Sequence, residues 1–141
     1  MRLWHYKMIP VLPRKQLIAQ LRECVQIGHS LHDRGTPNHI IVNRVISFYP
    51  DGFATYCKMI IDEVRARKYN VSKSTIEKLN SYCKQNIEMI ATTNVDKAEN
   101  PFPGFHNDRY LRQCFYNLEE KYDDGIISDD EWKEVEKLNI K

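Results

Sequence analysis

The feature that most constrains the fold is a helical spacing of apolar residues through most of the chain. After Pro13, apolar and small residues recur every three or four positions as far as Gly28. Three later stretches, near residues 53–64, 76–90 and 111–122, repeat this spacing. Residues 40–49 are rich in β-branched and aromatic residues, but a single strand would have no partner. We therefore expect an all-α fold, a compact single-domain bundle of four to five helices.

Signals for helix ends divide the chain further. Pro13 suits the first turn of a helix, and Ser74 with Glu77 forms a capping box. A second capping box, Ser128 with Glu131, predicts a short acidic last helix. Residues 28–38 contain Gly, Pro and several His and are expected to be a loop or a frayed helix end, and residues 91–105 are expected to be an ordered loop. We expect residues 1–125 to form the main helical domain, with residues 126–141 as a short acidic C-terminal helix packed on it.

Composition limits the class of protein. At 141 residues the chain fits one domain, and no apolar stretch is long enough to cross a membrane. The absence of an export signal and of a Cys-x-x-Cys pair predicts reduced thiols and a cytoplasmic location. Residues 1–90 carry a net charge of +7, whereas residues 91–141 carry −5. A basic body favours a polyanionic partner.

The first 23 residues hold the groups with the clearest chemistry. The α-amine of a chain titrates near about pH 8, so part of it is a neutral nucleophile at neutral pH. Arg2 follows Met1, and Glu23 with Arg22 lies on the predicted first helix. An amine, a carboxylate and cations for phosphate are what an imine-forming DNA-cleaving enzyme needs. Taken singly, Glu23 is better explained as an ordinary exposed glutamate, and the two arginines as surface or ion-pair residues.

Histidines and a cysteine raise the alternative of a metal site. His29, His32 and His39 follow Cys24, but their spacing matches no standard pattern of zinc ligands. We expect no metal and no other cofactor.

The order of residues resembles a known family. Arg2 followed by Leu17-Ile18-Ala19-Gln20-Leu21-Arg22-Glu23 is similar to the start of the phage-type pyrimidine-dimer DNA glycosylase/AP lyase family, the endonuclease V type of ultraviolet repair enzyme. Phe48-Tyr49 with residues 60–70 resembles its second helix, and residues 106–121 its third. Met1 to His5 with Leu12-Pro13-Arg14 resembles a bacterial branch. The resemblance covers roughly residues 1–122.

The resemblance implies a mechanism and a set of site residues. In the family, an N-terminal α-amine attacks the anomeric carbon of a damaged nucleotide, forms an imine and nicks the strand by β-elimination. The matching catalytic residues are Met1 and Glu23. Arg2 and Arg22 match arginines that hold phosphates, and Lys121 matches a lysine of the DNA-binding surface. We add Arg14 to this expected DNA-binding surface. The expected partner is double-stranded damaged DNA, bound by a monomer without a metal or a membrane.

Several positions depart from the family pattern. The nucleophile position is Met1 rather than threonine, and three cations or near-cations of the family are replaced by Gln16, Gln26 and Asn117. Fewer cations predict a weaker grip on phosphate. Two alternatives therefore stay open: a non-catalytic DNA-binding module that kept the fold, and a protein-interaction module whose acidic last helix binds a partner.

Overall fold

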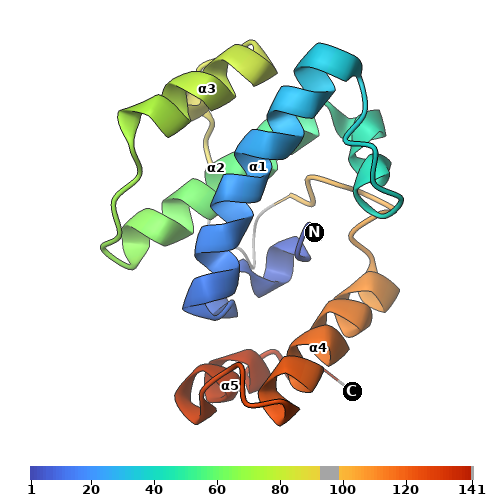
Figure 1. Cartoon of the computed structure of the whole chain (residues 1–141), viewed down its shortest axis with the longest axis vertical. Coiled ribbons are helices and arrows are strands. Elements are labelled where there is room, and N and C mark those ends of the chain that lie inside the picture. Colours follow the sequence, from blue (N-terminus) through green and yellow to red (C-terminus); the bar gives the residue numbers. More distant parts are fainter. Residues whose placement is uncertain (93–98, 141) are drawn as a thin grey trace.

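The computed structural model describes residues 1–92 and 99–140, which fold as helices without strands (Figure 1). The α-helices of this part are α1 (Arg14–Arg34), α2 (Asp51–Ala66), α3 (Lys73–Cys83), α4 (Asp108–Asp123) and α5 (Asp129–Glu136). Short 3-10 helices are η1 (Tyr6–Val11), η2 (Val42–Phe48) and η3 (Ile87–Met89). The all-α prediction is confirmed, and the 3-10 helices raise the helix count above the expected four to five.

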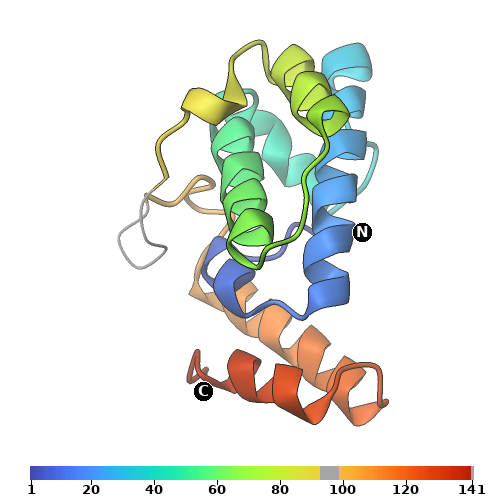
Figure 2. The same cartoon turned by 90° about the vertical axis from the view of Figure 1, so that its left-hand side faces the viewer.

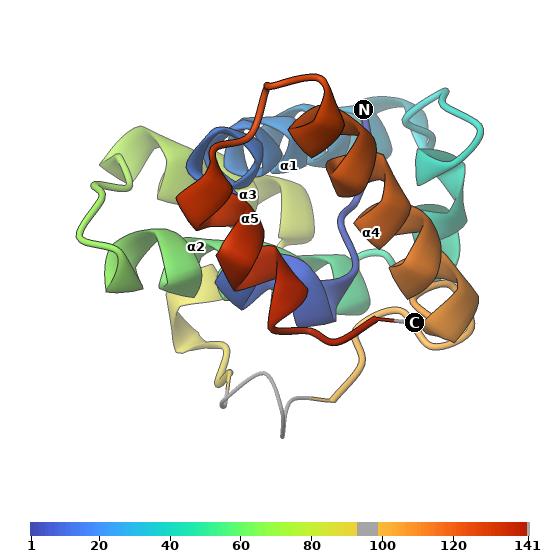
Figure 3. The same ribbon diagram turned by 90° about the horizontal axis from the view of Figure 1, so that it is seen from below.

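The helices form two groups. The first contains α1, α2 and α3, with α1 crossing in front of α2 and contacting α3 (Figure 1). The second is the α4–α5 hairpin at the end of the molecule opposite α3 (Figure 2). The N-terminal segment and η1 run between the two groups, and η1 contacts both α2 and α5. Seen from below, the N-terminus lies between α1 and α4 (Figure 3).

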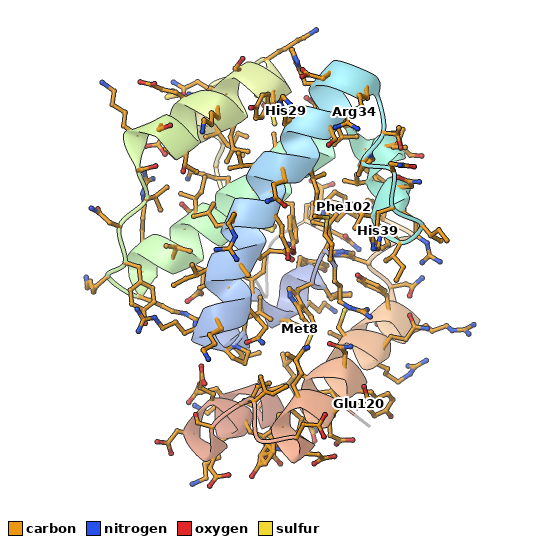
Figure 4. All side chains as sticks on the ribbon, viewed as in Figure 1. Met8, His29, Arg34, His39, Phe102 and Glu120 are labelled. Carbon is orange, nitrogen blue, oxygen red and sulfur yellow. The ribbon has the colours of Figure 1, made fainter. Side chains whose placement is uncertain are left out.

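The N-terminal segment is a central part of the core. Leu3 and Met8 are completely buried, and Trp4 retains only 6% of its exposure. They pack with buried aromatic residues of the other elements, among them Tyr56 of α2 and Phe102, which lies inside the molecule (Figure 4). Burial of such side chains contributes roughly 1.5–3 kcal/mol each, so the residues that follow Met1 are firmly held.

Helix α1 is longer than its sequence predicts. We expected a loop or a frayed helix end from Gly28, but the regular helix continues to Arg34 and ends at Gly35, which adopts the left-handed conformation (φ 76°). A Cβ atom at Gly28 would lie 3.2 Å from Tyr82 and 3.3 Å from Phe53. Gly28 thus allows α1 to approach α2 and α3 closely, and this tertiary packing outweighs the weak helix propensity of glycine.

Other predicted boundaries differ in detail. The N-cap of α3 is Ser72, whose hydroxyl accepts from the Thr75 N–H, so the predicted Ser74–Glu77 capping box is wrong. The predicted cap at Ser128 is confirmed, since its hydroxyl accepts from the Glu131 N–H at 3.2 Å. Residues 42–48, for which we expected no strand but a buried extended or helical connector, form the 3-10 helix η2. None of the helices in the described ranges has the length and apolar character of a membrane span.

Candidate active site

A cleft of about 840 Å³ opens between the N-terminal segment, the first half of α1 and the last half of α4. All six residues proposed from the sequence as catalytic or DNA-binding line this cleft, namely Met1, Arg2, Arg14, Arg22, Glu23 and Lys121. Its wall is completed by Trp4, Lys15, Gln16, Ile18, Ala19 and Asn117. The fold thus brings Lys121 to residues that lie about a hundred positions earlier in the sequence.

Backbone hydrogen bonds hold the segment that carries Met1. The Tyr110 hydroxyl of α4 donates to the Leu3 carbonyl at 2.7 Å. The Tyr56 hydroxyl of α2 donates to the Trp4 carbonyl at 2.6 Å. The Trp4 N–H in turn donates to the Gln20 Oε1 atom of α1 at 2.8 Å. Three helices therefore fix the backbone two and three residues away from the chain's first amine.

Glu23 lies on the third turn of α1, lines the cleft and is half-buried. Burial raises the pKa of its carboxyl above the usual value. The positive charges of the Met1 amine and Arg22 and a hydrogen bond from the Arg2 backbone lower this pKa, but burial has the larger effect. A carboxyl with a raised pKa exchanges its proton more readily near neutral pH. No ion pair joins the Met1 amine directly to Glu23 within the described ranges.

The cations of the cleft are available to an anion. The lining contains the positively charged side chains of Arg2, Arg14, Lys15, Arg22 and Lys121 and a single carboxylate. Among the residues that the structure describes, none of these five cations forms an ion pair, whereas arginines elsewhere do. Unpaired cations gathered in a concave surface raise the local concentration of anionic ligands.

Arg2 is held in place by neighbours other than a carboxylate. Its guanidinium lies 5.7 Å from the ring centre of Trp4 and 5.9 Å from that of Tyr110. One of its nitrogens approaches the Cys114 sulfur at 3.9 Å. These cation–π contacts orient the guanidinium without neutralising it.

The structure also locates the positions that depart from the family pattern. Gln16 and Asn117 line the cleft itself. Gln26 lies instead in a smaller neighbouring hollow that shares Ile18 and Arg22 with the cleft. Lys15 lines the cleft but was not singled out from the sequence, although its place beside Arg14 in the first turn of the helix was a usable signal.

The histidines considered for a metal do not form a metal centre in the part of the chain that is described. No group of three or more His, Cys, Asp or Glu residues there is placed to hold an ion. Cys24 is completely buried, whereas His29 and His32 pair with Asp33 at 3.2 Å and 2.9 Å. Figure 4 shows His29 on the last half of α1 and His39 on the connection that follows this helix.

Comparison with known families gives the assignment. The family model described as pyrimidine dimer DNA glycosylase matches residues 1–77, more than half of the chain. The chain belongs to this family. The matched segment carries Met1, Arg2, Arg14, Arg22 and Glu23, and with them the N-terminal and α1 walls of the cleft. The α4 wall of this family member, with Lys121, lies outside the match. Neither the curated proteins nor the solved structures searched yield a match.

Proposed function

We propose that this protein is a pyrimidine-dimer DNA glycosylase with AP lyase activity that acts on double-stranded damaged DNA through the Met1 α-amine. The observation that supports this function is the shared cleft. The chain belongs to the pyrimidine dimer DNA glycosylase family. Its cleft is lined by Met1, which carries the amine, by the half-buried carboxylate of Glu23 and by five cations that form no ion pair in the described residues. The first residue is itself half exposed, at 51%, so a DNA sugar has access to it.

In the proposed reaction the neutral Met1 amine attacks C1′ of the damaged nucleotide and forms a C–N bond. The C1′–base bond breaks, its electron pair leaves with the base, and the base takes up a proton. Opening of the sugar ring gives an imine between Met1 and C1′. A base then removes a proton from C2′, and the electron pair expels the 3′ phosphate by β-elimination. Hydrolysis of the imine restores the amine.

Glu23 has the proton-transfer role in this scheme. Its carboxylate accepts the proton that the attacking amine loses and stabilises the positive charge that develops on the sugar. The raised pKa of its carboxyl favours return of a proton to the sugar oxygen during ring opening. We place the C1′ atom in the cleft that Met1 and Glu23 both line.

The first test is chemical trapping. The protein is incubated with a duplex that contains an abasic site or a pyrimidine dimer, and borohydride is added to reduce the imine. We expect a covalent adduct on the Met1 nitrogen, located by mass spectrometry, and none after acetylation of the N-terminus. A folded protein that binds the duplex but forms no adduct would contradict the enzymatic proposal and support the non-catalytic DNA-binding alternative.

The role of Glu23 is tested by Glu23→Gln. We expect nicking of an abasic duplex to fall at least about a hundredfold, in the range typical of general acid–base groups, while duplex affinity changes little. The matched control is Glu120→Gln on the exposed face of α4 (Figure 4), which should nick normally. Nicking by Glu23→Gln at the native rate would remove Glu23 from the mechanism.

A further inference from the structure

Gln20 is the one completely buried polar side chain of α1 within the described residues, at 0% exposure. It lies one helical turn before Glu23, between the cleft and the core. A buried amide carries a large desolvation cost unless its donors and acceptors are paired. The partners of Gln20 therefore indicate what this side chain does.

Both ends of the amide are hydrogen-bonded. Its Oε1 atom accepts from the Trp4 N–H at 2.8 Å and lies 3.0 Å from the Tyr56 hydroxyl. Its Nε2 atom donates to the Glu23 carboxylate at 3.2 Å. Rotating the amide by half a turn would set its NH₂ group against the Trp4 N–H, two donors face to face. The backbone of Trp4 thus determines which end of Gln20 faces Glu23.

We propose that Gln20 is a positioning residue, which holds the Glu23 carboxylate in register with the segment that carries the Met1 amine. One side chain joins both partners: its oxygen holds Trp4, three residues after Met1, and its nitrogen holds Glu23. This inference rests on the proposed function, because it concerns the same amine and carboxylate. Tyr56, completely buried on α2, supports the amide from the core side.

A positioning role and a purely structural role predict different results. The charges that act on Glu23 are the Met1 amine and Arg22 of its own helix, and the Arg2 backbone donates a hydrogen bond to it. The side chains of Arg2 and of Lys121 on α4 line the same cleft. Each of them persists when only Gln20 is changed. Loss of the Gln20 donor therefore removes one stabilising contact from the ionised carboxylate and moves its titration to higher pH. A purely structural residue would alter stability alone.

The decisive variant is Gln20→Met, which has nearly the same shape and no amide. We expect single-turnover nicking of an abasic duplex at pH 7 to fall at least tenfold, with duplex Kd changed less than threefold. The acidic limb of the pH–rate profile should move to higher pH. Ser72→Ala, which removes the cap of α3 away from the cleft, is the control for stability and should lower Tm without moving the profile.

Two further measurements complete the test. Gln20→Glu keeps the oxygen acceptor for Trp4 but replaces the donor with an ionisable group, so its pH–rate profile should show an additional ionisation. Tyr56→Phe, the milder change, should move the profile in the same direction as Gln20→Met but less. If either Gln20 variant reproduces the native profile, or if the rate follows Tm alone across all variants, Gln20 is not a positioning residue.

An NMR titration separates this inference from the proposed function. The side-chain carboxyl carbon of Glu23 is followed against pH in the native protein and in Gln20→Met, which needs no activity. An upward shift of its midpoint in the variant is the expected result, and an unchanged midpoint overturns the inference. If the native protein forms no borohydride adduct, the proposed function is refuted. The titration would still test whether Gln20 acts on the Glu23 carboxylate, because it needs no activity.

Discussion

At the scale of single residues, Lys121 extends the cationic lining of the cleft onto α4. Each phosphate that a cation neutralises contributes about 0.9 to the slope of log K against log salt. We therefore expect Lys121→Ala to weaken duplex binding at low salt and to reduce the slope by about 0.9. Fluorescence anisotropy over a series of salt concentrations measures both quantities.

Lys137→Ala is the matched control, because the Lys137 amine pairs with Glu134 of α5 at 2.7 Å and does not line the cleft. It should leave the slope unchanged. Equal slopes for the native protein and for Lys121→Ala would show that this lysine contacts no phosphate.

At the scale of elements, α5 supplies the cap for the start of α1. The Arg14 N–H donates to the Glu131 Oε2 atom at 2.8 Å, across more than a hundred residues of sequence. A carboxylate at a helix N-terminus pairs with free N–H groups and complements the helix dipole. The acidic helix thus stabilises the element that carries Arg14, Arg22 and Glu23.

This cap predicts a measurable loss. Glu131→Ala should lower the free energy of unfolding by about 1 kcal/mol, and Glu131→Gln, which retains a neutral acceptor, by less. Urea denaturation compares both with Glu134→Ala, an exposed glutamate of the same helix, which should lose less than Glu131→Ala. A loss for Glu134→Ala as large as for Glu131→Ala would mean that the effect comes from general charge and not from the cap.

The packing of α5 also bears on its expected role. Trp132 lies against Phe115 and Tyr122 of α4, with ring centres 5.3 Å and 5.1 Å apart, and Val135 is completely buried. The apolar face of α5 is therefore occupied within the chain. Removing residues 126–141 would expose core and uncap α1, so substitutions on the exposed acidic face are the better test of the protein-interaction alternative.

At the scale of the whole molecule, two buried histidines join the N-terminal segment to the connection that leads into α4. The rings of His5 and His106 stack with centres 4.9 Å apart. The Nδ1 atom of His106 accepts from the Tyr6 N–H, and that of His5 accepts from the Lys7 N–H. Burial lowers the pKa of His5 to about 4, with a contribution from Lys7, and that of His106 to about 2, with a contribution from His5.

These lowered pKa values give the fold a pH dependence. Below about pH 6.5 the unfolded chain binds a proton at each histidine, whereas the folded protein does not until its lower pKa is reached. Above about pH 6.5 both histidines are neutral in the folded and in the unfolded chain, so they do not reduce the stability. As the pH falls below that value, protonation of the unfolded chain lowers the free energy of unfolding. At pH 5 we expect a loss of about 2 kcal/mol for each histidine, measured by urea denaturation at pH 7.5 and pH 5.

His5→Asn is the informative variant, because asparagine can still cap η1 as His5 does but does not titrate. It should reduce the pH-dependent loss to about half of the native value. His39→Asn, on the connection after α1, is the control and should behave as the native protein. Equal stability of the native protein at pH 7.5 and at pH 5 would contradict the lowered pKa values of the two histidines.

Local sequence patterns determined the all-α class and the cap at Ser128, whereas the residues of the candidate site were indicated by the resemblance to the family. The helix class and the cap depend on neighbours within one helical turn, so spacing alone predicts these two features. Tertiary contacts decided the rest. Gly28 stays helical because α2 and α3 approach it, and Gln20 is buried because the N-terminal segment and Tyr56 meet it there. Lys121 reaches the cleft only through the packing of α4. The faces by which two helices pack depend on residues that are far apart in the sequence. Local periodicity does not predict such contacts.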